Sequence, residues 1–350
     1  MADSETVPHD PNITLVEGFV PVIDLGFTRT PNPDREAATA RAIGQACSTS
    51  GFFVVVGHGV PQSLIDATCE ITRKFFLQPE EVKREIAYDP MDSLHRGWST
   101  WRSLQKFSAC RIGEPLLGGE QEPGVCDEKL IAPNRWPALP GFKETWLAYY
   151  LAIEAMSRRL HRLLALALDL PADWFEDKID NHMTPLAANY FLPAAEPGEH
   201  GPLRTEAHTD FGTVTVLYPE NTPGGGLQVR DRDKQWLDVP VIEGAFVINL
   251  GNLMAQWTNN RWASTIHRVV NPPDDLAHLD RISIPFFQQP NPDAMISCIP
   301  TCFDEDNPPR HAPVTAGEYF IARSRRIFVE RRVRERRGES DEVSLTRINR

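Results

Sequence analysis

The chain has 350 residues, a net charge of −12, 41% hydrophobic residues and 24% charged residues. These values exclude a largely disordered chain and a collagen-like or coiled-coil one. The sequence contains no run of 18 apolar residues, so it predicts no membrane span. Because phosphate contacts need an excess of Lys and Arg, the acidic balance argues against nucleic-acid binding.

The start of the chain lacks the basic and apolar stretches of a secretory signal. The six cysteines are widely spaced and form no CxxC pair. Both features predict reduced thiols in a cytoplasmic protein. The oligomeric state is left open by the sequence.

The first part of the chain alternates strand-like and helical patterns. Strands are expected at 20–26 and 52–57, where β-branched and aromatic residues gather. Helical periodicity and opening prolines predict helices at 34–50 with Asp34 as N-cap, at 61–76, from Pro79 onward, and over the long segment 141–169.

The turn-rich segment 89–140 gives no clear secondary-structure pattern. It carries Arg96, Arg102 and Arg111. These arginines could favour an acidic substrate, or they could be solvated.

From about residue 185 the pattern changes to short strands separated by turn residues. This spacing is typical of a β-sandwich or barrel, so the fold class is α+β. Strands are expected at 187–192, 213–217, 227–229, 245–250, 265–270, 281–287 and 295–299.

The chain returns to a helical pattern at 315–337, with eight arginines between Arg323 and Arg337. We interpret this stretch as a solvated helix face, with Glu330 and Glu335 as local partners. The alternative is an anion-binding surface for a substrate or partner.

The most informative motif is the segment 206–212, Glu-Ala-His-Thr-Asp-Phe-Gly. On a strand, residues i and i+2 share a face, so His208 and Asp210 can bind one ion. His267 lies on a later strand-like run. Two histidines and one carboxylate leave three positions open on a metal, which is the facial arrangement of non-haem Fe(II) oxygenases.

A second pair, Arg281 and Ser283, also shares one face of a predicted strand. A guanidinium matches a carboxylate in two-point contact, and a serine adds another donor. A dicarboxylic co-substrate that chelates iron at one end needs such an anchor at its other end.

With these motifs the chain resembles the 2-oxoglutarate/Fe(II)-dependent dioxygenases, in the branch that includes isopenicillin N synthase. The resemblance covers most of the chain. It rests on SGFFVVVGHGVP (50–61), AHTDFGTVTVL (207–217), FVINLGNLM (246–254), STIHRVV (264–270), RISIPFF (281–287) and TAGEY (315–319).

The resemblance implies a double-stranded β-helix, or jelly-roll, core flanked by N-terminal and C-terminal helices. We expect one catalytic unit with a helical N-terminal region at 1–180, a jelly-roll core at 181–314 and a C-terminal helix and tail at 315–350.

The resemblance assigns Fe(II) to His208, Asp210 and His267, and the distal carboxylate of 2-oxoglutarate to Arg281 and Ser283. It also places Asn189 in the co-substrate pocket.

Strand alternation puts Asn189 and Tyr190 on opposite faces. The Tyr190 hydroxyl is therefore absent from the pocket unless a local bulge turns it inward. Phe211 and Phe287 are candidates for the substrate pocket. The chain departs from the family in having Gly251-Asn252 where Gly-Asp is frequent.

The implied activity is oxidation of a small molecule with Fe(II), 2-oxoglutarate and O2, releasing succinate and CO2, with ascorbate as an in vitro reductant. Hydroxylation, desaturation and ring closure are all possible outcomes. The branch acts on amino acids, peptides and many secondary metabolites, so the substrate is left open.

Three other functions fit parts of the pattern. An oxidase like isopenicillin N synthase shares the motifs but uses no 2-oxoglutarate. A zinc hydrolase could use the same three ligands, although Arg281 would then have no role and only Glu206 lies near as a base. A catalytically silent binding protein is the third.

Overall fold

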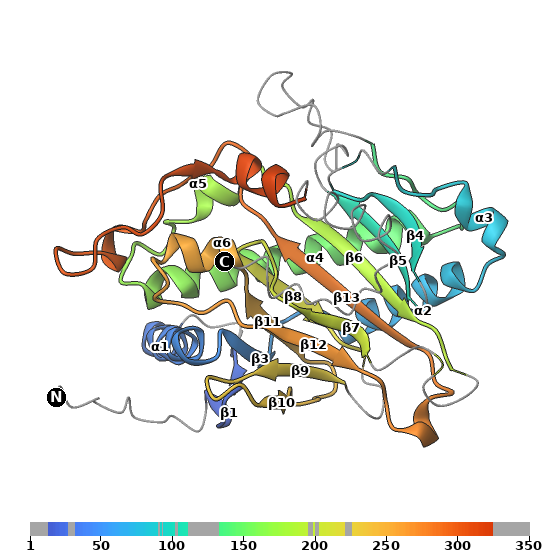
Figure 1. Cartoon of the computed structure of the whole chain (residues 1–350), viewed down its shortest axis with the longest axis horizontal. Helices are drawn as coiled ribbons and strands as arrows, with labels where there is room; N and C mark the ends of the chain where they lie inside the picture. Colours follow the sequence, from blue (N-terminus) through green and yellow to red (C-terminus); the bar gives the residue numbers. More distant parts are fainter. Residues whose placement is uncertain are drawn as a thin grey trace, which may run out of the picture.

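The computed structural model describes residues 13–26, 32–89, 92, 94–101, 104–110, 133–194, 199, 203–220 and 226–324. Within these ranges, two β-sheets form the centre of the protein and helices cover the outer face of the larger one (Figure 1).

The larger sheet has nine strands, and all neighbouring pairs are antiparallel except β2 and β3. Their spatial order is β1 (Thr14–Val16), β2 (Val22–Asp24), β3 (Phe52–Val56), β11 (Phe246–Leu250), β8 (Val214–Tyr218), β13 (Arg281–Gln288), β6 (Pro185–Phe191), β5 (Leu104–Cys110) and β4 (Gly97–Trp101).

The smaller sheet has four antiparallel strands, in the order β10 (Trp236–Asp238), β9 (Leu227–Arg230), β12 (His267–Val270) and β7 (Leu203–His208). A separate pair is formed by β14 (Met295–Ile296) and β15 (Val314–Thr315). The two main sheets make the jelly-roll core that the sequence predicts, within an α+β fold.

Helices α1, α2 and α4 pack together beside the larger sheet, and α2 contacts β6. The helices are α1 (Pro33–Thr49), α2 (Gln62–Phe76), α3 (Glu80–Arg84), α4 (Phe142–Ala167), α5 (Glu176–Ile179) and α6 (Asn252–Trp257), with short 3-10 turns at Asp274–Leu276 and Pro300–Cys302. Residues 316–324 are also helical. No helix among the described residues is long and apolar enough to cross a membrane.

The start of α1 corrects one local prediction. Asn32, not Asp34, is the N-cap, because its side chain accepts a hydrogen bond from the Arg35 backbone N–H at 3.0 Å. Pro33 occupies the first helical position, where its missing N–H costs nothing. Asp34 then lies in the first turn, where a negative charge favours the helix dipole.

Apolar residues fill two separate layers. The larger cluster lies between the helices and the outer face of the nine-stranded sheet. The smaller one lies between the two sheets and consists of Val20, Val22, Phe52, Val54, Leu227, Val229, Val239, Ala245 and Val247. The polar site described below lies at the border of this cluster, where Phe52 packs against His267.

The unassigned segment at 89–140 contains β4 and β5, which extend the larger sheet beyond β6. The N-terminal region thus contributes β1 to β5 to this sheet as well as its helices. The boundaries proposed at residues 180 and 314 stay a prediction.

Two other predictions lie partly outside the described residues. Of the eight C-terminal arginines, only Arg323 is described, and its guanidinium lies 5.4 Å from the Tyr319 ring. The cysteines Cys47, Cys69, Cys110, Cys298 and Cys302 are free thiols, as expected.

Phe107 on β5 joins the helices to the sheet. Its fully buried ring makes edge-on contacts with Phe75, Phe142 and Trp146, at centroid distances of 5.5, 5.1 and 4.8 Å. We expect Phe107→Ala to lower the free energy of unfolding by about 3–5 kcal/mol, because it leaves a cavity between two helices and a strand. Urea denaturation measures this loss, and Phe107→Leu is expected to lose less; equal losses would contradict the packing argument.

Candidate metal and co-substrate site

His208, Asp210 and His267 converge at the border of the inner apolar cluster. One potential ligand atom of each residue lies within 4.8 Å of the other two. His208 ends β7, His267 begins β12, and the two are cross-strand partners in the smaller sheet. The Asp210 Oδ1 atom lies 3.8 Å from each histidine Nε2.

Both imidazoles are oriented by the backbone. The Nδ1 atom of His208 lies 2.7 Å from the Glu206 carbonyl oxygen, and that of His267 lies 3.1 Å from the Thr265 carbonyl oxygen. A carbonyl only accepts, so each Nδ1 carries the proton and each Nε2 presents a lone pair to the centre. Phe52 packs edge-on against His267, with centroids 5.2 Å apart.

The Asp210 carboxylate is held by the larger sheet. Its Oδ2 accepts hydrogen bonds from Thr215 Oγ1 at 2.5 Å and from Asn249 Nδ2 at 2.7 Å. Burial alone would raise the pKa of Asp210, but the adjacent His267 and His208 and these two hydrogen bonds outweigh burial and lower it. Asp210 therefore stays charged, with Oδ1 turned toward the histidines.

The structure brings His208 and Asp210 together in a different way from the one that the sequence predicts. The strand ends at His208, and Asp210 lies in the turn beyond it, so strand alternation does not place the two side chains. The turn is tied to the start of α6 instead, where Asn252 N–H donates to the Asp210 carbonyl at 2.8 Å.

Gly251 makes this contact between the turn and α6 possible. A Cβ atom on it would overlap the Gly212 carbonyl oxygen. The Asn252 side chain, at the position where the family often has Asp, donates to Thr209 Oγ1 at 3.1 Å. With Asn in place of Asp, residue 252 thus donates a hydrogen bond from its side-chain amide to the turn that carries Asp210.

The surroundings of His208 keep its imidazole neutral. Burial, together with the neighbouring His267, lowers the pKa of His208 to about 4, and Lys106 on β5 adds to the effect. A neutral His208 next to a charged Asp210 is the combination of protonation states that binds a divalent cation.

Asn189, Ser283 and Arg281 lie on one face of the larger sheet. Ser283 pairs with Asn189 across β13 and β6, and Arg281 pairs with Phe191. The Asn189 Nδ2 donates to Ser283 Oγ at 3.2 Å, whereas its buried Oδ1 has no hydrogen-bond partner among the described residues. Lys106 continues the row as the β5 partner of Asn189.

Arg281 is a buried cation, with 4% of its surface exposed. Burial and the nearby Arg204 lower its pKa to about 10, while Glu220 acts in the opposite direction. The guanidinium carbons of Arg204 and Arg281 lie 5.6 and 5.9 Å from the Phe191 ring. Two arginines near one aromatic ring make this end of the polar row attractive for an anion.

Tyr190 faces the opposite side of the sheet. The registers of β6 with β5 and with β13 contain no bulge at this residue. Its ring stacks on Phe76 of α2, and its hydroxyl donates to Asp280 Oδ2 at 2.9 Å. Of the two possibilities left open by the sequence, the structure therefore shows the tyrosine outside the pocket.

The remaining candidate residues from the sequence lie in different environments. Phe287 is half-buried and pairs with Thr215, so it shares the face that carries Ser283 and Arg281. Phe211 is half-buried in the turn after Asp210, and its pocket role stays a prediction. Arg96 is fully buried, 3.5 Å from Asp92, and is not solvated; Arg102 and Arg111 lie outside the described residues.

The donor set fits Fe(II) and a dicarboxylate. Two imidazole nitrogens and one carboxylate oxygen suit a non-haem Fe(II) ion and leave positions for other ligands. Further along β13, the buried Arg281 and the Ser283 hydroxyl can bind a carboxylate.

Sequence reasoning missed Thr215 and Asn249. Each is a polar residue inside an otherwise apolar strand, in Val-Thr-Val-Leu-Tyr and Phe-Val-Ile-Asn-Leu. That pattern was visible in the sequence, but only the strand pairing of Asn249 with Thr215 shows that both reach one carboxylate.

Comparison with known proteins agrees with this geometry. Residues 20–139 match the family described as non-haem dioxygenase in morphine synthesis N-terminal, and residues 184–290 match the 2OG-Fe(II) oxygenase superfamily. The fold and the three converging ligands define a jelly-roll non-haem iron oxygenase.

Relatives extend the match over nearly the whole chain. A 2-oxoglutarate-Fe(II) type oxidoreductase of Aspergillus fumigatus is 33% identical over 89% of this chain and 94% of its own length. The validamycin A dioxygenase of Streptomyces hygroscopicus is 32% identical over 79% and 78%.

A solved structure of a full-length Neurospora crassa protein in complex with alpha-KG and thymine superposes with a TM-score of 0.79, at 26% identity over 90% of this chain and 99% of that one. The chain therefore belongs to the 2OG-Fe(II) oxygenase superfamily, and it is a 2-oxoglutarate-dependent dioxygenase with Fe(II) and 2-oxoglutarate as its cofactors. The zinc-hydrolase interpretation is not supported.

Thr215→Val tests the support of Asp210 in the metal-free protein. Valine keeps the shape but removes the donor, so we expect a loss of about 1.5–3 kcal/mol in unfolding free energy at neutral pH. The folded-state pKa of Asp210 is lowered, so this stabilisation is present above the unfolded pKa and is lost as pH falls through the folded one. Urea denaturation at several pH values should show that the difference in unfolding free energy between Thr215→Val and wild type becomes smaller as the pH falls. Thr215→Ser keeps the hydroxyl and should retain most of the stability. A pH-independent difference would contradict the assignment.

Proposed function

We propose that the protein hydroxylates a C–H bond of a small molecule at an Fe(II) ion held by His208 Nε2, Asp210 Oδ1 and His267 Nε2. One observation carries the proposal. Both Nε2 atoms and Oδ1 face one point, while the Nδ1 and Oδ2 atoms are engaged by the protein itself. The ligand geometry is thus supported before any ion binds.

Arg281 and Ser283 are proposed to bind the distal carboxylate of 2-oxoglutarate, with Asn189 positioning the Ser283 hydroxyl. Because Asn189 donates to Ser283 Oγ, the serine keeps its own proton for an anion. When bound, Fe(II), 2-oxoglutarate and O2 supply the oxidant, and succinate and CO2 are released.

The residues between these two ends are proposed to orient the substrate. Phe287 and Phe211 supply apolar contacts near the carboxylate ligand. The inner apolar cluster closes one side and keeps water from the reacting groups. Among relatives, the names validamycin A dioxygenase and proline hydroxylase support a small-molecule substrate, and secondary metabolism is the proposed setting. A cytoplasmic location and the absence of a nucleic-acid or membrane partner stay predictions.

The decisive assay is a screen of small molecules for stimulated succinate release with Fe(II), 2-oxoglutarate, O2 and ascorbate, followed by mass analysis of the product. A mass increase of one oxygen supports hydroxylation. Turnover that persists without 2-oxoglutarate would instead support an oxidase resembling isopenicillin N synthase, in which the arginine and serine bind a substrate carboxylate.

His208→Ala removes one of the three proposed ligands. We expect Fe(II) binding by the variant to weaken strongly and succinate formation to fall to background, because two ligands no longer fix the ion. Iron content after anaerobic purification and succinate release measure the two effects. Unchanged turnover would refute the ligand assignment.

Arg281→Gln removes the proposed anchor charge. The dissociation constant for 2-oxoglutarate should rise by about 10-fold or more, since a charge-assisted pair contributes at least about 1.4 kcal/mol, while Fe(II) binding is retained. Arg158→Gln is the matched control, because Arg158 pairs with Glu176 on the surface. A similar shift in both variants would contradict the anchor role.

A further inference from the structure

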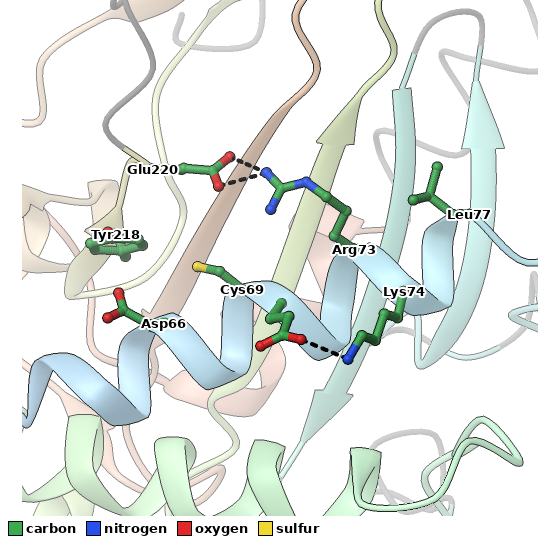
Figure 2. A pocket seen from close by; sticks show the side chains of 8 residues that line it. Asp66, Cys69, Arg73, Lys74, Leu77, Tyr218 and Glu220 are labelled. Carbon is green, nitrogen blue, oxygen red and sulfur yellow. Dashed lines mark hydrogen bonds and ion pairs between the residues drawn. The ribbon is translucent and has the colours of Figure 1, made fainter.

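A pocket of about 400 Å³ lies on the outer side of the larger sheet, beside α2 and the end of β8 (Figure 2). Arg73 extends from α2 toward Glu220, which follows β8 in the chain. Lys74, one residue further, turns away and pairs with Glu70 on the same helix. The two neighbouring cations of α2 therefore have different partners.

Arg73 binds two carboxylates. Its Nη2 donates to both oxygens of Glu220, at 2.6 and 2.7 Å, and its Nε donates to Asp280 Oδ2 at 3.1 Å. All three side chains are between 22% and 30% exposed. Such partly buried, multiply bonded pairs are screened less than surface pairs.

Both carboxylates lie close to the start of β13. Asp280 directly precedes Arg281, and Glu220 Oε2 accepts a hydrogen bond from the Ile282 N–H at 2.7 Å, on the other side of Arg281. Tyr190 adds a hydrogen bond to Asp280 from β6. Arg73 thus links α2 to the residues on either side of the proposed anchor.

Negative charge near Arg281 opposes the binding of an anion by its guanidinium. Glu220 is close enough to act on the charge of Arg281. Arg73 pairs with both Glu220 and Asp280, and its single positive charge offsets one of their two negative charges. Without Arg73, the full charge of Glu220 would act on the Arg281 guanidinium and compete with an incoming carboxylate.

We propose that Arg73 is a positioning residue for the co-substrate: by binding Glu220 and Asp280 it fixes the backbone on both sides of Arg281 and keeps that guanidinium directed toward the distal carboxylate of 2-oxoglutarate. The inference rests on the proposed role of Arg281. Arg73 acts only through other residues, since it lies on the outer side of the sheet.

The test compares Arg73→Met with wild-type full-length protein loaded with Fe(II) under anaerobic conditions. Calorimetric titration should show the dissociation constant for 2-oxoglutarate raised by about 10- to 100-fold, as for other residues that position ligand-binding groups, with Fe(II) affinity unchanged. 2-Oxobutyrate lacks the distal carboxylate, so its affinity should be the same in both proteins. Arg73→Lys should restore part of the affinity, because the charge returns without the planar fork.

Lys74→Met is the matched control and should bind 2-oxoglutarate as wild type does. Equal 2-oxoglutarate affinity in Arg73→Met and wild type would overturn the inference, as would a parallel loss for 2-oxobutyrate, which indicates general damage. If Arg73→Met fails to fold, Arg73→Lys carries the test, and it must still weaken 2-oxoglutarate more than 2-oxobutyrate. Failure of the wild type to bind 2-oxoglutarate contradicts the proposed function instead.

Discussion

The Asp210 carboxylate is the group on which the rest of the site depends. It is buried beside two imidazoles, and burial alone would favour its neutral form. His267, His208 and the two hydrogen bonds that Asn249 and Thr215 donate to one oxygen together outweigh burial, so that the charge persists and the other oxygen faces the histidines. The need for those donors explains why two strands of the larger sheet each carry one polar residue among apolar ones.

The two sheets contribute different parts of the chemistry. The smaller sheet supplies both histidines as a cross-strand pair, and backbone carbonyls set their tautomers. The larger sheet supplies the residues that hold Asp210 and, further along β13 and β6, the polar row of Arg281, Ser283 and Asn189. The apolar cluster between the sheets borders this polar region, since Phe52 packs against His267. The positions of the metal-site residues therefore depend on how the two sheets pack and on the turn that carries Asp210.

Local periodicity in the sequence predicted the α+β class and most helices and strands, and the family resemblance implied the jelly roll. The motif predicted the three converging ligands, although Asp210 lies in a turn and is not placed by strand alternation. The sequence also predicted that Asn189 and Tyr190 face opposite sides. It did not predict β4 and β5, whose segment is dominated by turn residues, nor Asn32 as the cap of α1. The partners Thr215, Asn249, Arg73 and Glu220 were beyond its reach, because their roles arise from contacts between elements distant in the chain.

The attachment of the three ligands to different sheets has a thermodynamic consequence. His208 and His267 belong to the smaller sheet, whereas Asp210 is bonded to the larger one through Thr215 and Asn249. An ion bound to all three would act as a cross-link between the sheets. The apparent stability of the whole fold would then rise with the logarithm of the free metal concentration, and separation of the sheets would become a route for metal loss.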